Sequence, residues 1–258
     1  MENVLELINE IDTGKAGIII YSPEKHAVIG ALNSELLLPL ASAAKVAVGF
    51  CIAKLVEDGH YHWDDLIEGI SFNPNEDSAQ IYPHFQNRKS LPLQDAVEVM
   101  IACHDSFVGN RIVQFCGGWE RIHKIGKTYF SKISITQNPR DIENSGEITQ
   151  ILELLSIIYS GYHHNPALWS PIINGLVRQH GEIDGIPTHH NNHMTGGLEN
   201  ATIHLGILGE FSKEPLLYVI GAKDLPNRNY ETKVDEKIIE AIRVLYKEYF
   251  IKTECSFL

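Results

Sequence analysis

Apolar and polar positions follow two different periods along this chain, and the period changes twice. Residues 3–11 predict a short helix, and the apolar runs 16–21 and 26–31 predict the two strands of a hairpin. Between about residues 42 and 179 the apolar spacing is that of helices, interrupted by a polar, proline-broken stretch. The pattern there predicts helices at residues 42–56, 93–103, 107–116, 119–125 and 147–159, around a loop at 69–90.

Strand-like spacing returns in the last third of the chain. The segments 193–199, 201–209 and 215–223 predict three strands, and residues 234–250 predict an amphipathic helix. Strands joined in sequence as hairpins form an antiparallel sheet, so both ends of the chain are expected to contribute to one sheet. In the middle, Asn144 and Glu147 have the spacing of a capping box for the helix that follows.

The order of elements predicts one α/β (α+β) domain over residues 1–258. An α/β lobe, residues 1–41 and 180–258, would consist of an antiparallel sheet flanked by N- and C-terminal helices. An all-α lobe, residues 42–179, would be inserted into it. The cleft between two such lobes is the expected place for a ligand.

The amino-acid composition and net charge limit the classes of function that this protein can have. The 258 residues are 44% hydrophobic and carry a formal net charge of -12 with a pI near 5.5. Such a chain buries a large core, and its acidic surface without a basic run excludes nucleic acid and acidic membranes as partners. We therefore expect a small-molecule or peptide substrate.

The N-terminus and the cysteines bear on cellular location. The first ten residues lack the basic region and long apolar core of a secretory signal, and no stretch reaches transmembrane length. The cysteines Cys51, Cys103, Cys116 and Cys255 lack metal-ligand spacing. Reduced, buried thiols in a cytoplasmic protein are the expectation, and a secreted protein whose signal has been removed is the alternative.

The tetrad Ser42-Ala43-Ala44-Lys45 opens a predicted helix that is apolar enough to be buried nearly all round. Residues three apart share a helix face, so the Lys45 amine is within reach of the Ser42 hydroxyl and can act as its base. A serine at a helix start also lies beside unpaired backbone N–H groups, which suit a developing oxyanion. A second Ser-x-x-Lys, Ser22 to Lys25, lies between the two predicted strands of the hairpin and is interpreted as its turn.

Two later segments extend the tetrad into a constellation. His104-Asp105-Ser106, with Asn110 shortly after it, falls within the helical part, and His193-Met194-Thr195-Gly196-Gly197 begins the strand-rich part. The order resembles that of the penicillin-recognising serine hydrolases, most closely the class A β-lactamase-like family. That family has Ser-x-x-Lys, then Ser-Asp-Asn, then Lys-Thr-Gly, and the resemblance covers nearly the whole chain.

The resemblance implies roles residue by residue. Ser42 would be the acylated nucleophile and Lys45 its unprotonated base, and the N–H groups of Ser42 and Gly197 would form the oxyanion hole. Thr195 would offer a hydroxyl to a substrate carboxylate or carbonyl. The remaining matched positions would line the substrate or brace the loop beside it, and these are Asp105, Ser106, Asn110, Met194 and Gly196.

Departures from the family pattern limit the expected activity. His104 stands where the family has a serine that relays a proton, a task that an imidazole can also perform. Ser106 replaces an asparagine, and Met194 replaces the lysine that attracts a substrate carboxylate. The glutamate that activates the deacylating water has no counterpart in a Glu-x-x-x-Asn setting, because Glu143 and Glu147 are interpreted as first-turn helix acids.

We therefore expect a serine hydrolase that forms an acyl-enzyme at Ser42, acts on an amide, ester or lactam, and hydrolyses β-lactams poorly. A non-catalytic protein that binds a ligand or partner, and a D-alanyl-D-alanine peptidase, remain alternatives. No cofactor is expected. His189 and His193 have a metal-ligand spacing if helical, but they precede a strand and lack a third ligand, so no metal site is predicted.

Overall fold

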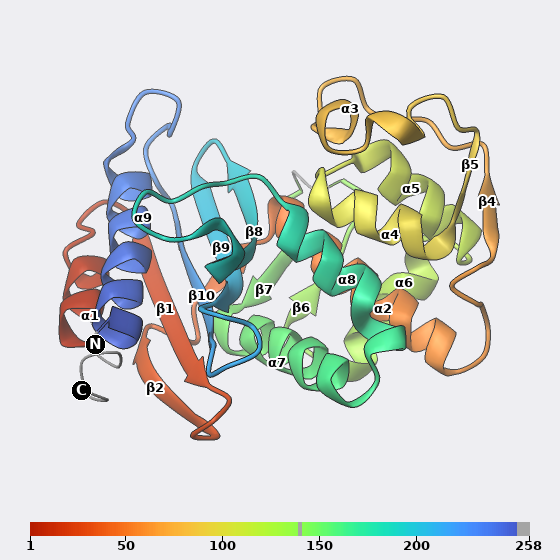
Figure 1. Ribbon diagram of the computed structural model, residues 1–258. Helices are drawn as coiled ribbons and strands as arrows, with labels where there is room; N and C mark the ends of the chain where they lie inside the picture. Colours follow the sequence, from red (N-terminus) through yellow and green to blue (C-terminus); the bar gives the residue numbers. More distant parts are fainter. Residues whose placement is uncertain (139–140, 252–258) are drawn as a thin grey trace.

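The computed structural model describes residues 1–138 and 141–251 and is built around a five-stranded antiparallel sheet (Figure 1). The strand order is β2-β1-β10-β9-β8, so the two ends of the chain do form one sheet. β1 pairs with both β2 and β10, and β8 lies at the edge nearest the helical lobe. The strands are β1 Lys15–Ser22, β2 Ala27–Leu32, β8 Asn191–Leu198, β9 Ala201–Leu208 and β10 Leu216–Lys223.

The sheet is buried on both faces, which explains why its central strands are almost entirely apolar. In β1, Ile18 and Ile20 pack in a cluster with α1 and α9, which cover one face, whereas Ile19 points into the core shared with the helical lobe. The covering helices are α1 Glu2–Asn9 and α9 Lys233–Tyr246, the latter continued by a π-helical turn, Lys247–Ile251. The sheet thus fixes β8 against the second lobe.

The helical lobe surrounds α2, Ala44–Glu57, which is buried nearly all round, as its continuous apolar sequence predicts. Phe50 of α2 meets the rings of Tyr129 and Phe130 edge-on, at centroid distances of 5.2 and 5.1 Å. This packing holds the start of α2, and with it Ser42, in a fixed position. The other helices are α3 Ser78–Ile81, α4 Leu93–Ala102, α5 Ser106–Phe115, α6 Trp119–Tyr129, α7 Ile148–His164 and α8 Pro166–Arg178, with 3-10 turns at Ala41–Ala43, Pro83–Phe85 and Thr188–His190.

The helical lobe was predicted to contain helices only, but the structure also contains short strands there. Two small sheets, with strand orders β4-β5 and β3-β7-β6, lie among the helices. Their strands are β3 Leu37–Pro39, β4 Leu66–Glu68, β5 Ser90–Pro92, β6 Ile133–Ser134 and β7 Ser145–Glu147. Helix α8 lies in a segment without a predicted helix.

The predicted capping box is wrong. Glu147 ends β7 and precedes α7 with extended backbone, its side chain makes no cap hydrogen bond, and it instead pairs with Lys132. The Asn144 side chain turns away from α7 and donates to the carbonyl of Ala41. The strand pairing of β7 with β3 accounts for the difference, because it commits the residues before α7 to a sheet.

The other local predictions agree with the structure where residues are described. Ser22 and Lys25 lie in the β1–β2 turn, where the Ser22 hydroxyl accepts from the Lys25 N–H at 3.3 Å. Cys51, Cys103 and Cys116 are buried thiols, and Cys255 lies outside the described residues. Within residues 1–138 and 141–251, no helix combines the length and apolarity needed to cross a bilayer.

Candidate active site

Ser42 lies in a tight 3-10 turn, Ala41–Ala43, directly before α2. Lys45 follows in the first turn of that helix, and its Nζ lies 3.4 Å from the Ser42 Oγ. Ala41 has a φ of 46°, a left-handed conformation that is rare for residues with a side chain. The strained turn thus places the serine and the lysine as the tetrad predicts, within hydrogen-bonding distance.

The environment of Lys45 makes its amine a usable base. Its residue is only 8% exposed. Burial lowers the pKa of Lys45 from 10.5 to about 8, although the carboxylates of Glu76 and Asp105 act in the opposite direction. At neutral pH a useful fraction of such an amine is unprotonated, as proton removal from a serine hydroxyl requires.

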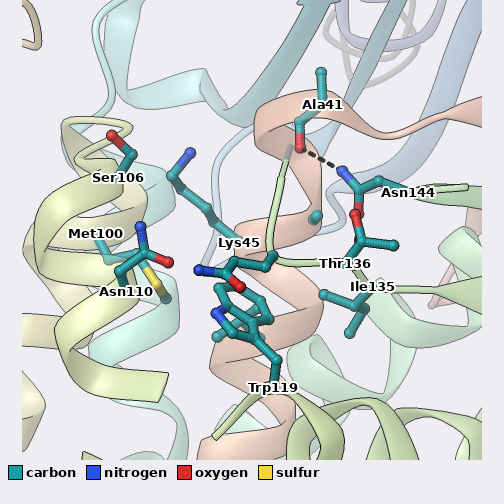
Figure 2. A pocket seen from close by; sticks show the side chains of 13 residues that line it. Ala41, Lys45, Met100, Ser106, Asn110, Trp119, Ile135, Thr136 and Asn144 are labelled. Carbon is teal, nitrogen blue, oxygen red and sulfur yellow. Dashed lines mark hydrogen bonds between the residues drawn. The ribbon is translucent and has the colours of Figure 1, made fainter. Parts of the chain in front are cut away.

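Asn144 braces the Ser42 turn. Its side-chain amide donates to the Ala41 carbonyl at 3.2 Å (Figure 2). Its backbone carbonyl accepts from the Leu40 N–H at 2.8 Å, and its Oδ1 accepts from the Thr136 N–H at 3.5 Å. The residue is fully buried. It therefore joins the loop after β6 to the strained residue that precedes Ser42.

The edge strand β8 runs against the other side of the turn. At Gly196 a Cβ atom would come within 2.2 Å of the Leu40 carbonyl oxygen and 3.1 Å of the Ala43 nitrogen, so only glycine permits this approach. Alternation along the strand places Thr195 on the opposite face from Gly196 and Met194. The predicted roles of Thr195 and of the Gly197 N–H remain predictions.

His104 lies near residues of the helical lobe and of strand β8. It lies between α4 and α5 with a φ of 56°, a second left-handed residue. Its Nε2 contacts the side-chain amide nitrogen of Gln179, which also lies 3.3 Å from the Met194 Sδ. Burial, with smaller effects of Lys45 and His193, lowers the pKa of His104 to about 4, so the ring is neutral at physiological pH.

Asp105 and Ser106 form the start of α5. The fully buried Asp105 carboxylate accepts from the N–H groups of Phe107 and Val108, each at 3.0 Å, and thereby caps the helix. It also accepts from the backbone N–H of Asn73 at 3.1 Å, and the Asn73 side chain donates to Ser106 Oγ at 3.0 Å. Asp105 is thus a bracing residue, as the resemblance implies, and Ser106 is held beside the Lys45 amine.

A small cavity of about 40 Å³, enough for ordered water, lies beside Lys45 (Figure 2). Its lining carries polar groups but no carboxylate among the described residues, and Asn110 Oδ1 is buried without a partner there. Glu143 is exposed and Glu147 is paired with Lys132, so neither reaches this cavity. The polar groups come from Lys45, Ser106, Asn110, Thr136, Gln137 and Asn144.

The histidine-rich segment shows no metal geometry. His193 lies in β8, and its Nδ1 is bound to the Asn191 carbonyl at 3.0 Å. His189 lies in a 3-10 turn and contacts the ring of His190. Across residues 1–138 and 141–251, no group of three His, Cys, Asp or Glu side chains is arranged to hold a metal ion.

Three contributors to the site were missed at the level of sequence. Gln179, Asn144 and Asn73 hold His104, the Ser42 turn and Ser106, respectively. Gln179 and Asn73 belong to no motif, Asn144 was predicted only as part of a capping box, and each of the three acts on a residue distant in the chain. Only the fold brings them to the site.

The fold and the Ser-Lys pair together are those of the β-lactamase/transpeptidase-like class of proteins. The pattern of the β-lactamase enzyme family matches residues 1–248, and the chain belongs to that family. No curated protein matches the sequence. The family match confirms the resemblance and, with the structure, the α/β fold class.

Solved structures share the fold at low sequence identity. A PBP-A variant, an acyl-enzyme complex with penicillin G, aligns at a TM-score of 0.77 and 16% identity, over 96% of this chain and 95% of that one. A β-lactamase from Chitinophaga pinensis gives 0.78 and 18%, over 96% and 98% of the two chains. One from Burkholderia vietnamiensis gives 0.76 and 10%, over 95% of each.

Proposed function

We propose that this protein is a serine hydrolase that forms an acyl-enzyme at Ser42, with Lys45 as general base, on an amide, ester or lactam. The observation that carries the proposal is the 3.4 Å approach of a buried, pKa-lowered lysine to a serine hydroxyl. Hydrolase chemistry of this general kind is that of the family. The particular substrate is a small molecule or peptide.

The proposed reaction begins with neutral Lys45. The amine takes the proton of the Ser42 hydroxyl as the Ser42 Oγ bonds to the substrate carbonyl carbon. The N–H groups of Ser42 and Gly197 would stabilise the oxyanion. The tetrahedral intermediate then loses its leaving nitrogen or oxygen, which departs with the proton that Lys45 had taken, and the acyl group stays on Ser42.

Release of the acyl group is the proposed slow step for β-lactams. A water must attack the ester at Ser42, and a carboxylate base would accelerate that attack. The cavity beside Lys45 offers amides and hydroxyls for a water, and no carboxylate among its described lining. Position 194, which holds a neutral methionine, also supplies no cation of its own to attract an anionic substrate.

Intact-mass spectrometry tests the proposal. The protein is exposed separately to penicillin G, p-nitrophenyl acetate and a fluorophosphonate. We expect an adduct in the wild type and in the matched control Ser22→Ala, and none in Ser42→Ala. The melting temperature of Ser42→Ala shows whether that variant is folded.

A second candidate is a non-catalytic protein that binds a ligand in the same cleft. The replaced positions His104, Ser106 and Met194 favour it, because each departs from the family pattern. It is adopted if no probe gives an adduct that depends on Ser42. A ligand-induced rise in melting temperature that survives in Ser42→Ala would support it further.

A further inference from the structure

Gln179 is a buried polar side chain whose position calls for an explanation. It directly follows α8 in extended backbone and is only 6% exposed. Its Oε1 is buried without a partner among the described residues, whereas its Nε2 contacts His104 and Met194. Burying an amide is unfavourable unless its polar groups are hydrogen-bonded. The contact of the Gln179 amide with His104 therefore offsets part of the cost of burying it.

The amide orientation determines which ring nitrogen of His104 carries the proton. An amide N–H can only donate, so an imidazole nitrogen facing it must be the unprotonated acceptor. In the observed orientation the two N–H groups face two acceptors, His104 Nε2 and Met194 Sδ. If the amide were rotated by 180°, its oxygen would face the Met194 sulfur. Its NH₂ group would then occupy the position of Oε1, where no hydrogen-bond acceptor lies among the described residues.

We propose that Gln179 is a positioning residue that holds His104 as a hydrogen-bond donor from Nδ1 and prevents it from acting as a proton carrier. The proposal rests on the acylation chemistry proposed above. With Nε2 occupied by the amide and the hydrogen on Nδ1, the neutral ring has no acceptor site to offer Lys45. The contact of the His104 side chain with Gln179 is through Nε2, and the residue is only partly buried, so we assign its Nδ1–H as the donor to a bound substrate.

This assignment differs from the relay that the resemblance implies for position 104. The proton that Ser42 gives to Lys45 would return directly from Lys45 to the leaving atom, while Nδ1–H of His104 stabilises that atom by a hydrogen bond. The ring gains and loses no proton, so the proton balance closes on Lys45 alone. Neutral imidazoles act as electrophiles in this way in other enzymes.

The surroundings of His104 agree with a neutral ring. The ionisable groups that act on it are Lys45 from α2 and His193 from β8, and both disfavour a positive charge on the imidazole. Gln179, which directly follows α8, contributes an uncharged donor.

Nitrogen NMR of the full chain with labelled histidine tests the proposal directly. His104→Gln identifies the His104 signals. We expect the wild type to show the hydrogen on Nδ1 and the ring to remain neutral at pH 6. A hydrogen on Nε2 in the wild type would overturn the proposal without any variant being needed.

Replacing the amide by a carboxylate should reverse the tautomer. In Gln179→Glu the new carboxylate accepts from Nε2–H, and the pKa of His104 should rise by about two units or more. Gln179→Leu should remove the tautomer preference. Gln114→Glu, at an exposed position of α5, adds the same charge and should change neither property. An unchanged tautomer in both Gln179 variants would contradict the proposal.

The rate of Ser42 acylation by p-nitrophenyl acetate gives a second readout. The wild type should show one pH-dependent limb, that of Lys45, and Gln179→Glu should gain a second limb from the titrating His104. If no variant acylates, the proposed hydrolase function fails. The NMR result still decides the Gln179–His104 assignment, so the two failures are distinguishable.

Discussion

At the scale of single residues, burial lowers the pKa of the Lys45 amine, and the proposed role of Lys45 as a base depends on that shift. With a pKa of about 8, about one tenth of the amine is neutral at pH 7. The acylation rate should therefore rise about tenfold per unit below pH 8 and level off above it, since only the neutral amine accepts a proton. Stopped-flow acylation by p-nitrophenyl acetate from pH 6 to 9 measures this.

Substituting the lysine of each Ser-x-x-Lys segment compares the role of Lys45 with that of Lys25. Lys45→Met should reduce acylation by on the order of 10²- to 10⁴-fold. Lys25→Met, in the β1–β2 turn, should leave the rate unchanged. A pH-independent rate in the wild type would argue against Lys45 as the base.

Asn144 acts at the same scale by bracing a strained residue. Asn144→Ala removes the buried donor to the Ala41 carbonyl and should lower the free energy of unfolding by about 1–3 kcal/mol. Acylation should slow as well, because Ala41 precedes the nucleophile. Urea unfolding and fluorophosphonate labelling measure the two effects, with Asn9→Ala, at an exposed site, as control. Loss of stability without slower labelling would limit Asn144 to a structural role.

Sequence reasoning located residues whose partners are near in the chain. Ser42 and Lys45 are three positions apart, so helical geometry alone predicts their contact. Asn144 and Ala41 are separated by 103 positions, and Gln179 and His104 by 75. The local pattern of apolar and polar residues does not predict such long-range contacts. The roles of Asn144 and Gln179 therefore follow only from the structure.

At the scale of elements, the site depends on how closely β8 approaches the start of α2. A methyl group at Gly196 would meet the backbone oxygen of Leu40 at 2.2 Å, and a backbone atom cannot rotate away. Gly196→Ala should therefore displace β8, lower the free energy of unfolding by about 1–3 kcal/mol and slow acylation. Thermal unfolding and fluorophosphonate labelling test this.

Gly126→Ala is the matched control for that change. Gly126 lies in α6, where an added Cβ would make an ordinary contact of 3.4 Å with the end of the Ile135 side chain. Alanine favours a helix over glycine by about 1 kcal/mol, so this variant should be neutral or stabilised. Equal effects of both substitutions would contradict the close-approach argument.

Elements with a regular period were predictable, whereas irregular ones were not. The strands β1, β2, β9 and β10 follow from apolar runs bounded by turn residues, and β8, which is mostly polar, was predicted from strand-like spacing next to them. Helix α8 begins at Pro166 and contains Pro171, which removes one helical hydrogen bond, so its sequence signal is weak. The β3-β7 pairing could not be predicted from such short segments, and it invalidated the capping box at Asn144.

At the scale of the whole molecule, buried neutral histidines link folding to pH. Burial lowers the pKa of His104 and His204 to about 4 and also lowers that of His193. The unfolded chain protonates these rings below about pH 6.5 while the native state does not. Stability should therefore be full above pH 6.5 and fall as the pH decreases towards 4.

The slope of this decline measures the number of histidines involved. Each contributes up to about 1.4 kcal/mol per pH unit, because the unfolded state binds one more proton than the native state. Urea unfolding from pH 7.5 to 4.5 should show the decline, and His204→Gln should make it shallower whatever its effect at pH 7.5. His60→Gln, at an exposed site, should keep the wild-type slope. Identical slopes in all three proteins would show that His204 is not neutral in the native state, and the burial argument would fail with it.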